Sequence, residues 1–338
     1  MEPRIIDSLF SKVYLCAHST ILPELIGDRR VVVLTDTNIF ALYNAELSCY
    51  EHIVIDGGEA NKNLATVQHI YRQLMDMGVD RSTLLLGVGG GIVTDITGFV
   101  AATYMRGIKF GFISTSLLGQ VDASVGGKCG VNLDDYKNMV GCFAHPEFVI
   151  LDVEMLQTLP KRELRAGMAE VVKSAIIGDY ELFEMVEQHA EEPIYEDRNF
   201  MQEVVARSLK VKLSIVEKDE HERGMRRLLN LGHTLGHAIE KCTHDVNHGE
   251  AVAIGMAMIC RAAERQSKLN AVESLRIIAL LNKLGLATNI AIPISNILPK
   301  VKLDKKKIDS MLNVVMPCEI GRCEVVSMEY DSFVEMFE

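Results

Sequence analysis

The apolar positions in the first half of the chain form short continuous runs, separated by stretches with helical spacing. Five runs are rich in Val, Ile, Leu and Phe and suit buried strands; they span residues 31–34, 52–55, 83–88, 110–114 and 148–151. Residues 61–78 carry apolar side chains at helical spacing and end in a glycine, and a second helix is expected to run through Tyr104. Strands that alternate with helices predict a mostly parallel, doubly wound sheet.

The second half of the chain has a different pattern. Long helical periodicity extends from residue 161 to about residue 284, with hardly any strand signal. Only residues 313–316 and 323–326 look extended, as in a small hairpin around Gly321. The sequence therefore predicts an α/β, Rossmann-like domain with a parallel sheet over residues 1–155, and an all-α domain over residues 156–338.

Composition and charge narrow the class of protein. The 338 residues are 48% apolar, which is enough for two cores, and no run of about 18 apolar residues suggests a membrane span. The polar start at Met1 predicts that there is no signal peptide. The formal net charge of -11 argues against nucleic-acid binding, so any anion would need a local basic cluster.

The eight cysteines are scattered, and none forms a CxxC pair. In a chain without a secretion signal this spacing predicts reduced, mostly buried thiols. We therefore expect a reducing, cytoplasmic compartment.

A glycine loop follows the third predicted strand. Gly89, Gly90 and Gly91 stand between an apolar strand and a helix start, where backbone N–H groups can meet a pyrophosphate. The loop is not the standard G-x-G-x-x-G fingerprint, because Ile92 occupies the position of its last glycine. A tight strand–helix turn without a ligand fits the same residues, so both interpretations stay open.

Polar residues follow the first two strands. Asp36 and Asn38 come after the first, and Glu59 and Lys62 after the second. Side chains at the strand ends of a doubly wound sheet face the ligand crevice, and acidic ones suit ribose hydroxyls. Turn and cap chemistry would explain Asp36 and Asn38 equally well.

Histidines cluster in the second half. His233 and His237 are four residues apart and share a helix face, and His244 and His248 follow. Two histidines with a carboxylate such as Glu170 form a usual ligand set for a catalytic zinc. Spacing does not say which of the four bind, and a satisfied core histidine is the alternative. The pattern is not H-E-x-x-H.

Cations lie close to these motifs in an otherwise acidic chain, as a bound phosphate or carboxylate would require. They are Arg106, Lys128, Lys137, Lys173, Lys212, Arg226 and the run Lys305-Lys306-Lys307. A solvated charged face is the better interpretation for the Lys305 run taken alone. Lys128 is more telling, because it follows two glycines in an apolar stretch.

Together these motifs resemble the 3-dehydroquinate synthase family, collinearly from about Thr35 to the end. The most specific stretches begin at Gly89, Tyr104, Gln120, Lys137, Ala169, Leu229 and His248. The resemblance implies an NAD-binding α/β domain, a helical domain, an active site in the cleft between them, and a homodimer.

It also implies a reaction. 3-Deoxy-D-arabino-heptulosonate 7-phosphate would become 3-dehydroquinate and phosphate, in the shikimate route to aromatic compounds. The steps would be transient oxidation by NAD, phosphate elimination, re-reduction and intramolecular aldol closure.

The resemblance also assigns residues. Metal ligands would be Glu170, His233 and His248, with His237 as an unligated acid/base group and His244 as a bystander. Nucleotide contacts would be Asp36, Asn38, Glu59, Lys62, Gly90, Gly91, Asp95, Thr115, Ser116, Asp122, Lys137, Thr158 and Glu163. Catalytic groups besides His237 would be Lys173, Lys212, Glu222 and Asn230, and substrate contacts would be Arg106, Lys128, Asn138, Arg226 and Lys305.

A few positions depart from the family pattern. Ser114, Thr94 and Tyr136 stand where proline, glycine and glycine are common, but no charged or ligand residue is missing. Three alternatives stay open: another sugar-phosphate cyclase, a metal-dependent polyol dehydrogenase, and a catalytically silent scaffold. His and carboxylate ligands suit zinc and cobalt alike, so the metal is undecided.

Overall fold

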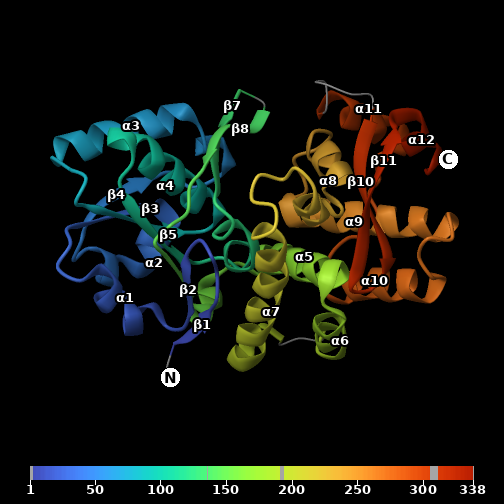
Figure 1. The fold of residues 1–338 in the computed structure, drawn as a ribbon, viewed down its shortest axis with the longest axis horizontal. Coiled ribbons are helices and arrows are strands. Elements are labelled where there is room, and N and C mark those ends of the chain that lie inside the picture. Colours follow the sequence, from blue (N-terminus) through green and yellow to red (C-terminus); the bar gives the residue numbers. More distant parts are fainter. Residues whose placement is uncertain (1–2, 135, 191–193, 305–310, 338) are drawn as a thin grey trace. The chain divides into compact units, whose positions relative to one another are not determined.

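The chain divides into two compact units, Met1–Pro160 and Lys161–Glu338 (Figure 1). The computed structural model describes residues 3–134, 136–190, 194–304 and 311–337. Each unit is described by itself below.

The first unit is built on a seven-stranded sheet in the order β1-β2-β9-β6-β5-β3-β4. Its strands are β1 (Arg4–Ile6), β2 (Lys12–Leu15), β3 (Val31–Asp36), β4 (Glu51–Ile55), β5 (Leu84–Gly89), β6 (Lys109–Ser114) and β9 (Phe148–Leu151). Only the pair β1–β2 is antiparallel. The predicted parallel sheet is therefore confirmed, and all five predicted strands belong to it.

Four strands were not predicted from the sequence. β1 and β2 are short, and a separate antiparallel pair, β7 (Lys128–Leu133) with β8 (Tyr136–Phe143), carries Gly130 opposite Gly141. A Cβ on either glycine would press on the backbone of the partner strand. Glycine lowers the strand signal, yet here it is what allows the two strands to approach.

Helices cover the sheet of the first unit on both faces. They are α1 (His18–Ile26), α2 (Thr37–Leu47), α3 (Leu64–Asp76) and α4 (Gly91–Thr103). Shorter helical turns are η1 (Glu59–Asn61), η2 (Tyr104–Arg106), η3 (Gly119–Ala123) and η4 (Val153–Thr158). Asp36 caps α2 by accepting hydrogen bonds from the N–H groups of Asn38 and Ile39, so the cap interpretation of this residue is confirmed.

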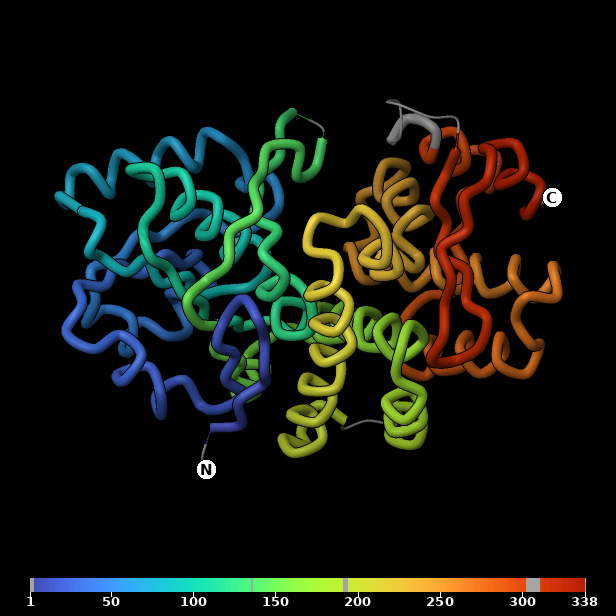
Figure 2. Tube along the Cα trace, in the orientation of Figure 1, coloured from blue at the N-terminus to red at the C-terminus, as the bar shows by residue number. Residues whose placement is uncertain are grey.

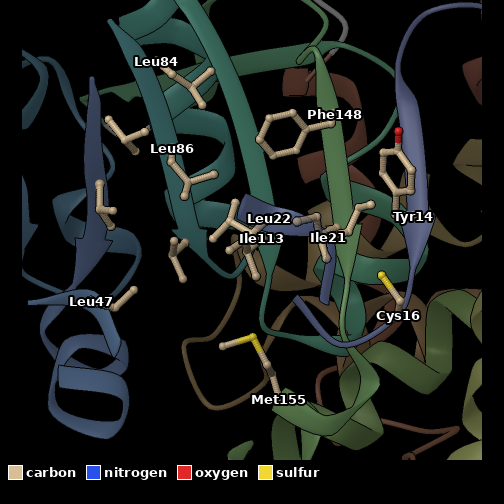
Figure 3. Packing of buried hydrophobic residues seen from close by; sticks show 14 residues of the cluster. Tyr14, Cys16, Ile21, Leu22, Leu47, Leu84, Leu86, Ile113, Phe148 and Met155 are labelled. Atoms are coloured by element: carbon tan, nitrogen blue, oxygen red, sulfur yellow. The ribbon is translucent and has the colours of Figure 1, made fainter. Parts of the chain in front are cut away.

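The apolar side chains of the sheet pack against α1 and α2. Leu84 and Leu86 point to one face of β5 because they are two residues apart. There they join Ile21 and Leu22 of α1 and Leu47 of α2 in one cluster (Figure 3). This packing fixes the central strands, whose carboxyl ends carry the candidate nucleotide residues.

Over its described residues, the second unit is helical apart from one hairpin. Its helices are α5 (Lys161–Gly178), α6 (Tyr180–Gln188), α7 (Arg198–Val216), α8 (His233–Glu240), α9 (His248–Arg265), α10 (Ala271–Lys283), α11 (Ile294–Asp304) and α12 (Tyr330–Glu335), with turns η5 (Ile194–Glu196) and η6 (Met225–Asn230). The hairpin pairs β10 (Met311–Glu319) with β11 (Arg322–Glu329), as the adjacent red segments of Figure 2 show. It is longer than predicted and turns at Gly321, whose φ is 95°.

Two smaller expectations can be compared with the structure. Only Cys16, Cys129 and Cys260 of the eight cysteines are buried, so the expectation of mostly buried thiols is wrong; all eight are free. Among the described residues, no helix combines the length and the hydropathy that a membrane span requires.

His18 joins three elements of the first unit. It is the first residue of α1, and its backbone N–H and ring Nδ1 lie 3.0 and 2.7 Å from Oδ2 of Asp152, just after β9. Its Nε2 lies 2.8 Å from Glu46 Oε2 in α2. A ring that donates to two carboxylates is an imidazolium. The hydrogen bond to Asp152 is the main reason why the pKa of His18 is raised above 6.5.

This bridge predicts a pH-dependent stability. A raised pKa means that the contribution of His18 is fully present below about pH 6.5 and is lost as the pH rises through the higher value. Burial raises the pKa of Asp152, but hydrogen bonds from His18 outweigh it and lower the pKa below 3.8. Its contribution is therefore lost only as the pH falls through that lowered value.

We expect His18→Gln to lower the free energy of unfolding by about 1–3 kcal/mol near pH 6, and by less near pH 9. Urea unfolding of both proteins at the two pH values measures this difference. His69→Gln is the matched control, because His69 is an exposed histidine of the same unit. An equal loss at both pH values would show that the charge of His18 is not involved.

Candidate active site

Three helices of the second unit bring Glu170, His233 and His248 together. Glu170 lies in α5, and the two histidines are the first residues of α8 and α9. His233 Nε2 lies 3.7 Å from Glu170 Oε1, and His248 Nε2 lies 3.9 Å from the same oxygen. One ligand atom from each residue falls within 4.8 Å of the others. Glu170 and His248 are 78 positions apart in the sequence, yet the three residues converge on one point.

This donor set fits a divalent metal ion. Glu170 is 1% exposed, and within the described ranges no hydrogen bond reaches its Oε1. Lys173 forms an ion pair with the other carboxylate oxygen. A buried carboxylate oxygen without a hydrogen bond is costly, and a cation shared with the two imidazole nitrogens would offset that cost.

The two histidines differ in their electrostatics. Burial, then the charge of Lys173 and the neighbouring rings, holds the pKa of His233 well below its ordinary value. Its nitrogen lone pair is therefore available to a metal at neutral pH. Burial also lowers the pKa of His248, but the neighbouring carboxylates of Glu240 and Glu170 outweigh it and raise the pKa. A metal ion would compete with that proton.

A second group of possible ligands shares His248. His237, Glu240 and His248 also offer ligand atoms within 4.8 Å of one another. The ring centres of His233 and His237 are 5.4 Å apart, and those of His237 and His248 are 6.0 Å apart. His244 belongs to neither group. The structure therefore selects three of the four histidines that spacing alone left equivalent.

Glycines allow the three helices to meet. A Cβ on Gly249 would overlap the carbonyl oxygen of Ala166 in α5, and one on Gly255 would overlap that of Gly232, the N-cap of α8. The start of α9 is fixed by a capping box between Asn247 and Glu250. His248 is thus placed by close helix packing and by a well-formed helix end.

Several predicted catalytic and substrate residues are buried in the same unit. Lys173, Lys212 and Arg226 are 2%, 6% and 3% exposed. Asn230 donates a hydrogen bond to Glu222, and the Arg226 guanidinium donates one to the carbonyl of Glu220. A buried cation destabilises the folded protein unless it is paired with an anion or binds a ligand. Lys305 lies outside the described residues.

In the first unit, residues from separate motifs meet around Lys62. Its Nζ lies 2.5 Å from Asp95 Oδ2 and 2.6 Å from Asn138 Oδ1. Asn132, which the sequence did not single out, accepts from the N–H of Asn138 at 2.9 Å and donates to Glu59 at 2.8 Å. Lys62 is 5% exposed. The structure therefore joins Glu59, Lys62, Asp95 and Asn138 in one polar network.

The glycine loop lies where β5 ends and α4 begins. Gly90 is the N-cap of α4, and no side chain caps the helix. A Cβ on Gly90 would lie 3.0 Å from Ser116 Oγ, and one on Gly91 would lie 3.1 Å from the Cβ of Ala123. Thr115 follows the neighbouring strand, and its N–H donates to the carbonyl of Gly89 at 3.0 Å. Gly90, Gly91, Thr115 and Ser116 are therefore adjacent.

The remaining nucleotide candidates are spread more widely. Asp122 lies in η3 and Lys137 in β8. Thr158 and Tyr43 both line a cavity of about 630 Å³. The hydroxyl oxygens of these two residues are 2.9 Å apart. Glu163 belongs to the second unit, in α5, and accepts from Asn247 Nδ2 at 3.2 Å. Arg106 and Lys128 lie in η2 and at the start of β7, in the first unit.

Comparison with known proteins places the chain among enzymes. Residues 52–166 match the model of the 3-dehydroquinate synthase N-terminal domain, and residues 167–307 match that of the C-terminal domain. A 3-dehydroquinate synthase of Thermoanaerobacter sp. is 39% identical over 331 residues, which cover 94% of this chain and 92% of that protein. One from Acetivibrio thermocellus is 41% identical over 327 residues, covering 93% and 89%.

Solved structures agree on the fold. The 2-epi-5-epi-valiolone synthase of Streptomyces hygroscopicus, with NAD+ and Zn2+ bound, superposes with a TM-score of 0.88 at 26% identity, covering 99% of this chain and 98% of that one. A 2-deoxy-scyllo-inosose synthase gives a TM-score of 0.87 at 24% identity, with 99% of both chains covered. With both halves of the chain matched by family models and relatives about 40% identical over nearly its whole length, the chain belongs to the 3-dehydroquinate synthase family.

Proposed function

We propose that this protein converts 3-deoxy-D-arabino-heptulosonate 7-phosphate to 3-dehydroquinate and phosphate. It is an NAD- and divalent-metal-dependent carbon–oxygen lyase of the shikimate pathway. The observation that carries the proposal is the convergence of His233 and His248 on the buried Glu170, in a chain about 40% identical to 3-dehydroquinate synthases.

Glu170, His233 and His248 would hold one zinc or cobalt ion. Bound there, the ion would act as a Lewis acid that orients and polarises substrate hydroxyls. Lys173, paired with Glu170, would keep a positive charge beside the substrate. His237 stands within one helical turn of His233 and would exchange the proton of the hydroxyl that is oxidised.

The nucleotide site would lie at the carboxyl ends of β3, β4, β5 and β6. The adjacent backbone of Gly90, Gly91, Thr115 and Ser116 suits a pyrophosphate at the start of α4. The ribose hydroxyls would form hydrogen bonds with Asp36, Asn38, Glu59 and Asp122. The remaining polar contacts of the nucleotide would come from Lys62, Asp95 and Lys137. The cavity beside Thr158, with apolar walls and a few polar groups, suits a flat heteroaromatic ring. Glu163 is assigned to the nucleotide by resemblance to the family.

Substrate recognition would rest on cations and amides. Arg106, Lys128, Asn138, Arg226 and Lys305 would hold the phosphate and carboxylate, because guanidinium, ammonium and amide groups all donate hydrogen bonds to such anions. Lys212, Glu222 and Asn230 would orient the sugar hydroxyls. The half-buried hydrogen bond between Asn230 and Glu222 supports this assignment, because it fixes the two side chains relative to each other.

Further assignments follow the family. We propose that residues 1–155 form the nucleotide-binding domain, with Thr158 and Glu163 contributing from beyond it, and that residues 156–338 hold the metal and most of the substrate. We also propose a homodimer, as the resemblance to the family implies, and a cytoplasmic location, with which the eight free thiols agree.

Phosphate release with catalytic NAD and zinc tests the proposed reaction. Because the cofactor would be reduced and reoxidised in each turnover, phosphate should accumulate while NADH absorbance stays flat. One NADH per substrate would instead indicate a polyol dehydrogenase. No phosphate from this substrate, with release from another sugar phosphate, would indicate a sister cyclase such as the two solved structures.

A further inference from the structure

The ring of His248 faces a carboxylate on each side. Nε2 is turned to Glu170 Oε1 at 3.9 Å, and Nδ1 lies 3.5 Å from Glu240 Oε1. Glu240 is the last residue of α8, and its side chain is 9% exposed. Neither sequence motifs nor the assignments above give this buried carboxylate a role.

We propose that Glu240 is a positioning residue, which accepts a hydrogen bond from His248 Nδ1–H and thereby aims Nε2 at the metal. The inference rests on the proposed metal site of Glu170, His233 and His248. It adds a residue that acts on the metal through a ligand and that does not itself touch substrate or cofactor.

The physical reason is the tautomer of a neutral imidazole. Such a ring carries one hydrogen, and only the other nitrogen has a lone pair for a metal. An acceptor beside Nδ1 keeps the hydrogen there, fixes the ring orientation and makes Nε2 a stronger donor. Without it, His248 could turn or shift the hydrogen, since only one end of its ring faces Glu170.

His233 shows the same arrangement with a different acceptor. Its Nδ1 lies 3.1 Å from the carbonyl oxygen of Leu231, and its Nε2 faces Glu170 Oε1 at 3.7 Å. Both histidines therefore present Nε2 to one carboxylate oxygen. A backbone carbonyl orients the first ring, and Glu240 would orient the second. The histidines at the starts of α8 and α9 would therefore be oriented in the same way by two different acceptors.

Glu240 could instead be a ligand, because it forms the second possible group with His237 and His248. Geometry favours the positioning role. Glu240 lies on the Nδ1 side of His248, whereas Nε2 faces Glu170, which is more deeply buried and lacks a hydrogen bond at Oε1 within the described residues. A metal held by Glu240 would leave that oxygen without a cation.

Zn2+ affinity of the full-length, metal-free protein tests the inference, by competition with a chromophoric chelator. Glu240→Gln keeps the shape but loses the charge, and we expect Zn2+ to bind about 10–100-fold more weakly. Glu240→Ala should weaken it at least as much. Glu264→Gln, an exposed carboxylate near the far end of α9, is the matched control and should bind like the unchanged protein.

Two further readouts separate positioning from a general structural effect. With Co2+ in place of Zn2+, the visible bands of Glu240→Gln should shift, because the orientation of one ligand changes. The thermal midpoint of its metal-free form should match that of the unchanged protein. A Glu240→Asp variant that recovers part of the affinity would support a role for the carboxylate at this position.

The outcomes are distinct. If the unchanged protein binds no Zn2+, the proposed metal site itself fails. If it binds Zn2+ and both Glu240→Gln and Glu240→Ala bind equally well, only the positioning role is overturned. If Glu240→Gln abolishes binding while Glu170→Gln retains it, Glu240 is a ligand and the inference is wrong.

Discussion

Replacing His233 with alanine should abolish tight metal binding and lower turnover by about 10³-fold or more. The variant removes one of the three proposed ligands, so that only the buried Glu170 and His248 remain to bind the ion. A bound metal contributes several kcal/mol to charge stabilisation in a reaction of this class, which corresponds to several orders of magnitude in rate.

Metal content after dialysis and the rate of phosphate release measure the two effects. His244→Ala is the matched control, because His244 is an exposed histidine near the start of α9 that belongs to neither ligand group. It should keep both metal and turnover. NAD affinity, measured by calorimetry since the chain has no tryptophan, should be unchanged in both variants. A His233→Ala protein that retains stoichiometric metal would contradict the proposed ligand set.

The fold was predictable wherever the local pattern and the tertiary environment agree. The strands 31–34, 83–88 and 148–151 read as continuous apolar runs because a parallel sheet buries both of their faces. β1 is exposed and only three residues long. The β7–β8 pair depends on two glycines, and the need for glycine there is evident only from the close approach of the partner strand. Such elements carry little local signal.

The candidate site was predictable by residue type but not by arrangement. Spacing placed His233 and His237 on one helix face, yet it could not bring Glu170 of α5 to them, because that depends on how α5, α8 and α9 pack. Glu240 was missed although it follows His237 by three residues, the spacing of one helix face. A carboxylate one turn after a candidate ligand is the signal that could have identified it.

Asp36 and Lys62 are candidate nucleotide residues that also stabilise the fold. Asp36 was a nucleotide candidate with an alternative as a cap, and the structure shows the cap. Lys62 is held by Asp95 and Asn138, so three candidates from separate motifs stabilise one another. Capping and ion pairing do not exclude ligand contact, because each carboxylate has further acceptor capacity.

Replacing His237 with alanine should leave the metal in place and slow turnover by about 10²–10⁴-fold, the usual contribution of a positioned acid/base group. His237 is not part of the Glu170–His233–His248 set, although its ring centre is only 5.4 Å from that of His233. Zn2+ affinity should therefore stay within a few-fold of the unchanged protein, while kcat falls.

This variant also decides between the two possible ligand groups. His237 and Glu240 belong to one group, and Glu170 and His233 belong to the other, with His248 in both. If His237→Ala lost the metal while His233→Ala retained it, the ion would sit with Glu240, and His237 could not be the proton carrier. Retained metal with slow turnover would separate the two roles, because the group that moves the proton must then be distinct from the groups that hold the ion.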